Sequence, residues 1–169
     1  MIDRKFCCFV GRLDSRIHRK EFIDKLSLYK TIDIIENNGN YLYDSLPYDN
    51  GFETKINHLN KYKFVISFEN ADKLGYVTEK AIDPILSQTS MIYFGNKESF
   101  NLDFSIDPNL ILKDSSDYDR LVEYIKKLDN DNKLYINSLK KQFLKNNRVY
   151  LYNNKIKTFF TNICNSSNI

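Results

Sequence analysis

Residues 64–83 read FVISFENADKLGYVTEKAID, and this stretch decides the fold. It begins with an apolar run that ends at Phe68, passes through a polar turn with Gly75, and ends in a segment with helical spacing. This pattern predicts a buried β-strand followed by a helix, with a polar loop at the crossover. Ligands of open α/β sheets bind where strands end and helix N-termini present N–H groups. The stretch therefore predicts a binding loop for an anionic ligand.

Strands and helices alternate on both sides of this stretch. Short apolar runs predict strands at residues 5–10, 31–35, 64–68, 91–95 and 110–112. Helical spacing predicts helices at residues 19–28, 56–62, 78–88, 117–128, 131–144 and 149–164. Residues 36–52 are rich in Asn, Gly, Asp and Tyr and are expected to form a loop. This order predicts an α/β fold with a parallel sheet and right-handed crossovers.

The helix predicted at residues 78–88 has an unusual interior. Ala81, Ile82, Ile85 and Leu86 are expected to form its apolar, buried side. Pro84 lies beyond the first turn, so it is expected to kink the helix or to end it early.

The composition is that of a globular domain. The chain has 169 residues, 42% of them hydrophobic, which is enough for a core within one domain spanning residues 1–169. The net charge of +3 comes from 25 basic and 22 acidic residues spread along the chain, which argues against a nucleic-acid partner. No apolar run of membrane-spanning length and no export leader is found, so a cytoplasmic protein is the expectation.

The three cysteines are not arranged for disulfides or for zinc. Cys7 and Cys8 are neighbours on a predicted strand and should point to opposite faces, and Cys164 is alone near the C-terminus. The sequence contains no CxxC motif and no Cys/His spacing typical of a zinc site. We therefore expect free thiols and no structural metal.

If the anionic ligand is a nucleotide diphosphate sugar, the polar residues of the crossover have the chemistry to bind it. Lys80, in the first turn of the predicted helix, offers an ammonium beside the positive end of the helix dipole. Thr78 can cap that helix or donate to phosphate. Glu79, expected to face a different direction from Lys80, can accept from a sugar diol. Tyr76 can stack on the ligand or bond a phosphate oxygen, and Asn70 can donate and accept at once.

Two phosphates call for a second cation. Arg19 is expected at the same edge of the sheet, and arginine matches the bidentate geometry of phosphate. A purely structural interpretation is also open, in which Glu79 and Lys80 are a solvated helix end and Thr78 is only a cap. Arg19 would then be a surface charge. Asp83 is interpreted as a charge near the N-terminus of its helix rather than as a catalytic acid.

Three ordered blocks of the chain resemble the signature of a known family. They are residues 62–70 (YKFVISFEN), 75–83 (GYVTEKAID) and 92–95 (IYFG). They resemble the pattern YKF-x-x-x-FEN, GYVTEK-x-x-D and PIYWG of the α-1,3/α-1,4-fucosyltransferases, glycosyltransferase family 10. Arg19 and Phe22 are similar to the Arg-x-x-Phe helix start of that family, so the resemblance covers most of the chain.

The resemblance implies a Rossmann-like parallel sheet flanked by helices, which corresponds to the C-terminal donor-binding domain of a two-domain GT-B glycosyltransferase. It implies that Arg19 and Lys80 neutralise the pyrophosphate of GDP-fucose, while Glu79 accepts from a sugar hydroxyl. Tyr76 and Asn70 would contact phosphate or fucose. The substrate-binding residues expected on this basis are Arg19, Asn70, Tyr76, Thr78, Glu79 and Lys80.

The resemblance also implies the reaction: an inverting transfer of fucose from GDP-fucose to a glycan acceptor, for example one containing N-acetylglucosamine. No essential metal and no further cofactor are expected. The general base belongs to an N-terminal acceptor domain, which is expected to be absent because Met1 lies a few residues before the first strand. A separate acceptor-domain chain is then the expected partner, and a membrane-anchored parent protein stays open. The alternative is a non-catalytic remnant that binds a GDP-sugar or a partner protein.

Overall fold

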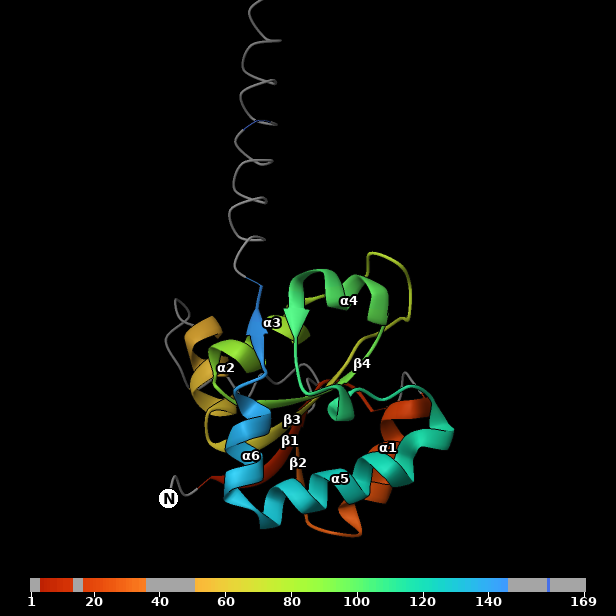
Figure 1. The fold of residues 1–169 in the computed structure, drawn as a ribbon, viewed down its shortest axis with the longest axis vertical. Coiled ribbons are helices and arrows are strands. Elements are labelled where there is room, and N and C mark those ends of the chain that lie inside the picture. The colour runs from red at the N-terminus through yellow and green to blue at the C-terminus, as the bar shows by residue number, and fades with distance from the viewer. Residues whose placement is uncertain (1–3, 14–16, 36–50, 146–157, 159–169) are drawn as a thin grey trace, which may run out of the picture.

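The computed structural model describes residues 4–13, 17–35, 51–145 and 158, and its centre is a parallel β-sheet (Figure 1). The strands of the sheet are β1 (Lys5–Val10), β2 (Ile32–Ile35), β3 (Tyr62–Phe68) and β4 (Ser90–Phe94). They lie in the order β2-β1-β3-β4, and every neighbouring pair is parallel. The α/β fold with a parallel sheet, predicted from the alternation of strands and helices, is confirmed.

The remaining elements connect and surround the strands. The helices are α1 (Ile17–Ser27), α2 (Gly51–Leu59), α3 (Glu79–Leu86), α4 (Lys97–Asp103), α5 (Tyr118–Asn130) and α6 (Asn132–Leu139). Short 3-10 turns lie at Pro108–Leu110 and Ser115–Asp117. Two short strands, β5 (Phe104–Ser105) and β6 (Phe143–Leu144), pair antiparallel. The predicted helix at 149–164 and most of the predicted loop at 36–52 lie outside the described residues.

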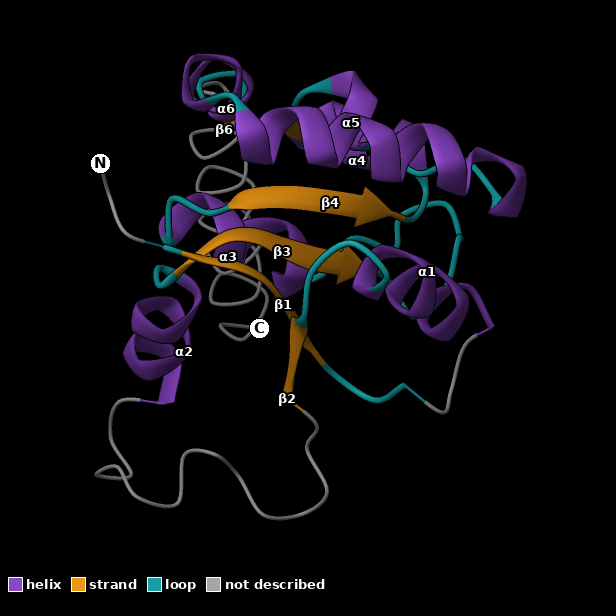
Figure 2. Cartoon of the chain, turned by 90° about the horizontal axis from the view of Figure 1, so that it is seen from below, coloured by secondary structure: helices purple, strands orange, loops and turns teal. Residues whose placement is uncertain are grey.

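Helices cover both faces of the sheet (Figure 2). Cys7 and Phe9 of β1 belong to a large core that also contains buried side chains of α1 and α5. Cys8 points to the other face, where it packs with Leu59 of α2 and Val65 of β3. The prediction that the two cysteines face opposite ways is therefore confirmed. Burial raises the pKa of both thiols, so each stays protonated and unreactive near neutral pH.

Several predicted elements differ from the structure. The helix predicted at 56–62 is α2, which begins at Gly51 within the predicted loop and ends at Leu59. Tyr62 is instead buried and begins β3 in register with Lys5. The strand predicted at 110–112 is reduced to a single parallel bridge between Ile111 and Tyr93, because the segment before it forms a 3-10 turn. The helix predicted at 131–144 ends at Leu139, since the chain then turns to pair β6 with β5. Helix α4 was not predicted.

Helix α3 is shorter than predicted, and its expected apolar side is only partly buried: Ala81 is buried and Ile85 packs against the core. The helix ends at Leu86, soon after Pro84, as expected for a residue that has no N–H to donate. Ile82 and Leu86, predicted to be buried, are 44% and 50% exposed. Asp83, Pro84 and Ala81 are the buried residues of this helix. The expectation that Asp83 is simply a charge at the helix end is therefore wrong.

Candidate functional site

The predicted crossover lies at the carboxyl edge of the sheet, between β3 and α3. Thr78 caps α3 by accepting a hydrogen bond from the Lys80 N–H at 3.4 Å. The loop before it turns at Gly75, whose φ of 80° lies in the left-handed region that favours glycine. The Gly75 N–H donates to Ser99 Oγ of α4 at 2.7 Å, which fixes the loop to a second helix. Tyr76 follows this turn and is half-buried.

Arg19 and Asn70 come together at this edge, as predicted. The Arg19 guanidinium donates to Asn70 Oδ1 at 2.5 Å and to the carbonyl oxygen of Phe68 at 2.7 Å. It lies over the ring of Phe9, and the residue is only 3% exposed. Arg19 is therefore a buried cation and not the surface charge of the structural interpretation. Oδ1 of Asn70 thus accepts from Arg19, and its NH₂ is a donor group.

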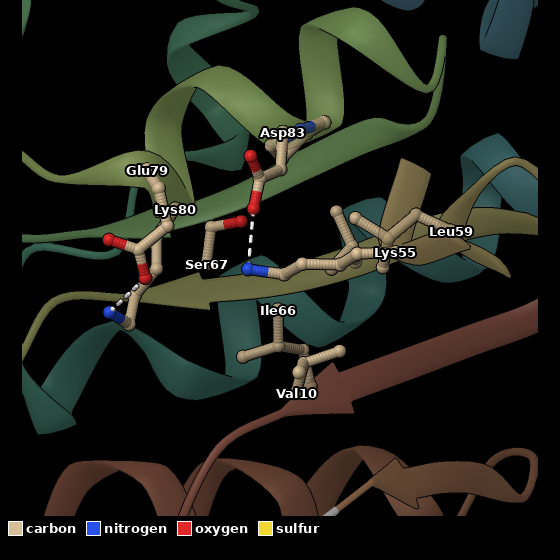
Figure 3. A pocket seen from close by; sticks show the side chains of 10 residues that line it. Val10, Lys55, Leu59, Ile66, Ser67, Glu79, Lys80 and Asp83 are labelled. Atoms are coloured by element: carbon tan, nitrogen blue, oxygen red, sulfur yellow. Dashed lines mark hydrogen bonds and ion pairs between the residues drawn. The ribbon is translucent and has the colours of Figure 1, made fainter. Parts of the chain in front are cut away.

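Thr78, Glu79 and Lys80 form one hydrogen-bonded group at the start of α3. Lys80 Nζ donates to Glu79 Oε1 at 3.0 Å and to Thr78 Oγ1 at 3.4 Å. The expectation that Glu79 and Lys80 face different directions is therefore wrong. Their Cβ atoms diverge on the helix, but the long side chains bend toward each other and pair their charges (Figure 3).

The charges of this group are held in a half-buried setting. The Lys80 side chain is 19% exposed and that of Glu79 is 55% exposed. Desolvation opposes ionisation of Glu79, but the hydrogen bond and the charge of Lys80 outweigh it and lower the pKa of the carboxyl. Glu79 is therefore an ionised acceptor at neutral pH, and Lys80 presents its ammonium beside the N-terminus of a helix.

Glu69 is a site residue that the sequence reasoning missed. It follows β3 directly and is only 2% exposed. Its Oε1 accepts from the Thr78 N–H at 2.8 Å, and its Oε2 accepts from the Thr78 hydroxyl at 2.7 Å. Thr78 was expected either to cap the helix or to donate to phosphate; its oxygen caps α3, and its single hydroxyl proton points to Glu69. An acidic residue directly after a buried strand was the signal available in the sequence.

A small cavity of about 30 Å³ lies beside α3, with Val10, Ser67, Glu79 and Lys80 among its lining residues (Figure 3). Inside it, Lys55 Nζ of α2 lies 2.5 Å from Asp83 Oδ2. The side chains of Lys55 and Asp83 are 24% and 4% exposed. This ion pair fixes α3 to α2 behind the residues that begin α3.

Metal clusters and membrane-spanning helices are not found in the part of the chain that the structure describes. The His, Cys, Asp and Glu residues of that part contain no group of three or more placed to hold a metal ion. The helices described there include none with the length and apolar character needed to cross a membrane.

Comparison with known proteins connects this geometry to a family. Residues 3–168 match the model of the C-terminal part of glycosyltransferase family 10 (fucosyltransferase). The chain belongs to this fucosyltransferase family. The resemblance of the three sequence blocks is therefore confirmed.

Relatives of the family 10 chain include fucosyltransferases of bacteria and animals. It is 30% identical over 174 residues to the alpha-(1,3)-fucosyltransferase FucT of Helicobacter pylori, a match that covers 99% of this chain and 35% of that protein. It is 28% identical over 134 residues to glycoprotein 3-alpha-L-fucosyltransferase A of Drosophila melanogaster, a match that covers 78% of this chain and 26% of that protein. The matched regions thus make up only a minor part of the length of these relatives.

Solved structures show the same fold. The crystal structure of an alpha1,3-fucosyltransferase with GDP-fucose superposes with a TM-score of 0.64 at 31% identity, covering 82% of this family 10 chain and 39% of that one. A crystal structure of alpha1,3-fucosyltransferase with GDP gives the same TM-score and identity and covers 38% of the solved chain. The family 10 chain therefore has the Rossmann-like fold of a GT-B fucosyltransferase domain.

Proposed function

We propose that this chain is the donor-binding domain of a fucosyltransferase and that it binds GDP-fucose at the carboxyl edge of its sheet. The observation that carries the proposal is the grouping of two cations, Arg19 and Lys80, with a helix N-terminus at that edge. Cations and N–H groups together are what a pyrophosphate requires. The GDP-fucose complex of a structural relative supports the same ligand class.

Each residue of the site receives a role in this proposal. Lys80 neutralises the pyrophosphate. Arg19 adds positive charge from beneath the site and orients the amide of Asn70. The ionised Glu79 accepts from a sugar hydroxyl, for which its 55% exposed side chain is suitably placed. Tyr76 contacts phosphate or fucose from the loop. Thr78 holds the start of α3.

The proposed reaction is an inverting transfer of fucose to a glycan acceptor such as one containing N-acetylglucosamine. The domain stabilises the negative charge of the departing GDP with fixed cations and helix N–H groups, in a setting where no reorganisation is needed. We assign the general base to an acceptor domain and the donor site to this single domain. In this proposal GDP-fucose is the donor substrate, and the chemistry requires no metal.

Isothermal titration calorimetry with GDP tests the proposal. Wild type should bind GDP, and Lys80→Ala should weaken binding about thirtyfold, because a charged hydrogen bond of about 2 kcal/mol is lost. Lys133→Ala is the matched control: it removes the same charge from an exposed position on α6 and should leave the affinity unchanged. Absence of GDP binding, or equal effects of the two substitutions, would refute the proposal.

A transfer assay separates donor binding from catalysis. The purified chain is mixed with GDP-fucose and N-acetyllactosamine, and fucosylated product is measured. We expect GDP binding without turnover, because the base is assigned to an acceptor domain. Turnover by this chain alone would contradict that assignment.

A further inference from the structure

We propose that Glu69 is a positioning residue for the donor. Its carboxylate holds together the two ends of the loop 70–77, and it fixes which groups donate and which accept in the hydrogen bonds from Thr78 to Lys80. This inference rests on the proposed function for its ligand, but its geometry does not depend on that ligand. The roles assigned above give Glu69 no part in binding.

Glu69 joins the two ends of the loop 70–77 as a clamp. Glu69 is fixed to the sheet, because its N–H donates to the Phe94 carbonyl oxygen of β4 at 2.8 Å. Both of its carboxylate oxygens are then used on a single residue, Thr78, at 2.8 and 2.7 Å. The loop between these two residues carries Asn70 and Tyr76, so the clamp closes the loop at its base. Charge-assisted hydrogen bonds of this kind are roughly twice as strong as neutral ones.

Glu69 also sets the direction of the hydrogen bonds at the start of α3. Because Thr78 gives its only hydroxyl proton to Glu69, its oxygen can only accept from other groups. It does accept, from the N–H and from Nζ of Lys80, both at 3.4 Å. Glu69, Thr78 and Lys80 are thus linked by successive hydrogen bonds. Because the buried carboxylate takes the hydroxyl proton of Thr78, the Thr78 oxygen is an acceptor for the Lys80 ammonium. Glu69 acts on the donor site through these hydrogen bonds and does not touch the ligand itself.

The Glu69 side chain lies against a glycine. Gly95, directly after β4, leaves room that a side chain would fill: a Cβ there would lie 2.8 Å from Glu69 Cγ and 2.7 Å from Tyr93 Oη. Both contacts are far closer than atoms tolerate. Because Gly95 has no Cβ, the Glu69 side chain can occupy this position beside the end of β4.

The buried charge of Glu69 has an electrostatic cost. A buried carboxylate next to an anion-binding edge is unfavourable unless its hydrogen bonds compensate it. A neutral glutamine side chain in place of Glu69 would fit the same volume but has only one oxygen to accept, so it cannot receive both Thr78 donors in the same way. The carboxylate offers one oxygen to each donor of Thr78, whereas a glutamine amide would have to accept both on its single oxygen or turn its NH₂ toward one of them.

Limited trypsin digestion of the free protein tests the clamp without any ligand. Lys73 is exposed in the loop, so the rate of cleavage after Lys73 reports how often the loop opens. Glu69→Gln and Thr78→Val should raise that rate about tenfold, equivalent to about 1.4 kcal/mol of opening free energy, relative to cleavage after Lys133 as the internal reference. Thr78→Ser keeps both donors and should cleave like wild type. Unchanged cleavage in both Glu69→Gln and Thr78→Val would overturn the inference.

Calorimetry with GDP then tests the positioning role. Glu69→Gln and Thr78→Val should each weaken GDP binding about tenfold, and Thr78→Ser should retain it. If Glu69 acts through Thr78, the double variant should bind GDP no more weakly than Thr78→Val alone. Independent, multiplying losses would overturn this role. Failure of wild type to bind GDP would instead refute the proposed function, while the digestion result would still decide the clamp.

Discussion

The ion pair between Lys55 and Asp83 gives a quantitative prediction. Removing one partner leaves the other charge buried, which typically costs about 3–5 kcal/mol, whereas replacing both with apolar residues is close to neutral. Asp83 is 4% exposed and Lys55 24%, so the two single substitutions should differ. Lys55→Met leaves an isolated buried carboxylate and should cost about 3–4 kcal/mol of unfolding free energy. Asp83→Leu leaves an ammonium on a flexible stem that can turn to water, so it should cost about 2 kcal/mol.

A double-mutant cycle measures this coupling. Urea unfolding is followed by far-UV circular dichroism for wild type, both single variants and the double variant Lys55→Met/Asp83→Leu. The double variant should lie within about 1 kcal/mol of wild type, which means a coupling free energy of several kcal/mol between the two sites. Losses that simply add, or a larger loss for Asp83→Leu than for Lys55→Met, would refute the reasoning from burial.

Two further predictions concern other buried contacts. Desolvation opposes ionisation of Asp129, but hydrogen bonds from Lys30, Lys63 and Tyr29 outweigh it and lower the pKa of its carboxyl below the usual 3.8. Its contribution to stability is therefore present above about pH 4 and is lost as the pH falls through the lowered pKa. Below about pH 4, the unfolding free energy of wild type should consequently fall more steeply with pH than that of Asp129→Asn. Equal pH dependence of the two proteins would contradict this. Gly95→Ala should lower the free energy of unfolding by about 1–3 kcal/mol, and the melting temperature by several degrees, because the added methyl overlaps Glu69 and Tyr93. An unchanged melting temperature would show that these side chains can move aside.

The central sheet could be predicted from the sequence because its strands are short and mostly apolar, and β3 and β4 are buried along nearly their whole length. Strands β1 to β4 were all expected within two residues of their observed bounds. The errors fall where tertiary contacts override local pattern. Phe143 and Leu144 continue a helical pattern, yet they form β6 because Phe104 and Ser105 offer a free strand edge nearby. Ile82 and Leu86 are apolar, yet Asp83 and its partner Lys55 take the buried side of α3.

The sequence predicted which residues gather at this edge of the sheet better than it predicted their contacts. The edge position of Arg19, Asn70 and the start of α3 followed from strand order and helix polarity. The direction of flexible side chains did not, as the pairing of Glu79 with Lys80 demonstrates. Glu69 was missed because a carboxylate beside an anion site has no evident role until its partner Thr78 is located across the loop. Which roles these residues have toward a ligand stays a prediction for the calorimetric experiments.

The thiols of Cys7 and Cys8 point to opposite faces of β1, so their reactivity can report local opening of this domain. Cys7 is 1% exposed in the core beneath α1 and α5, and Cys8 is 0% exposed in the separate core beneath α2. A thiol-reactive reagent can reach either sulfur only after the layer above it lifts. With Cys164 replaced, the order in which the two sites are alkylated, read by mass spectrometry, would reveal which layer of the sandwich detaches first. The alkylation of these two adjacent residues thus reports separately on the opening of the two faces of the sheet.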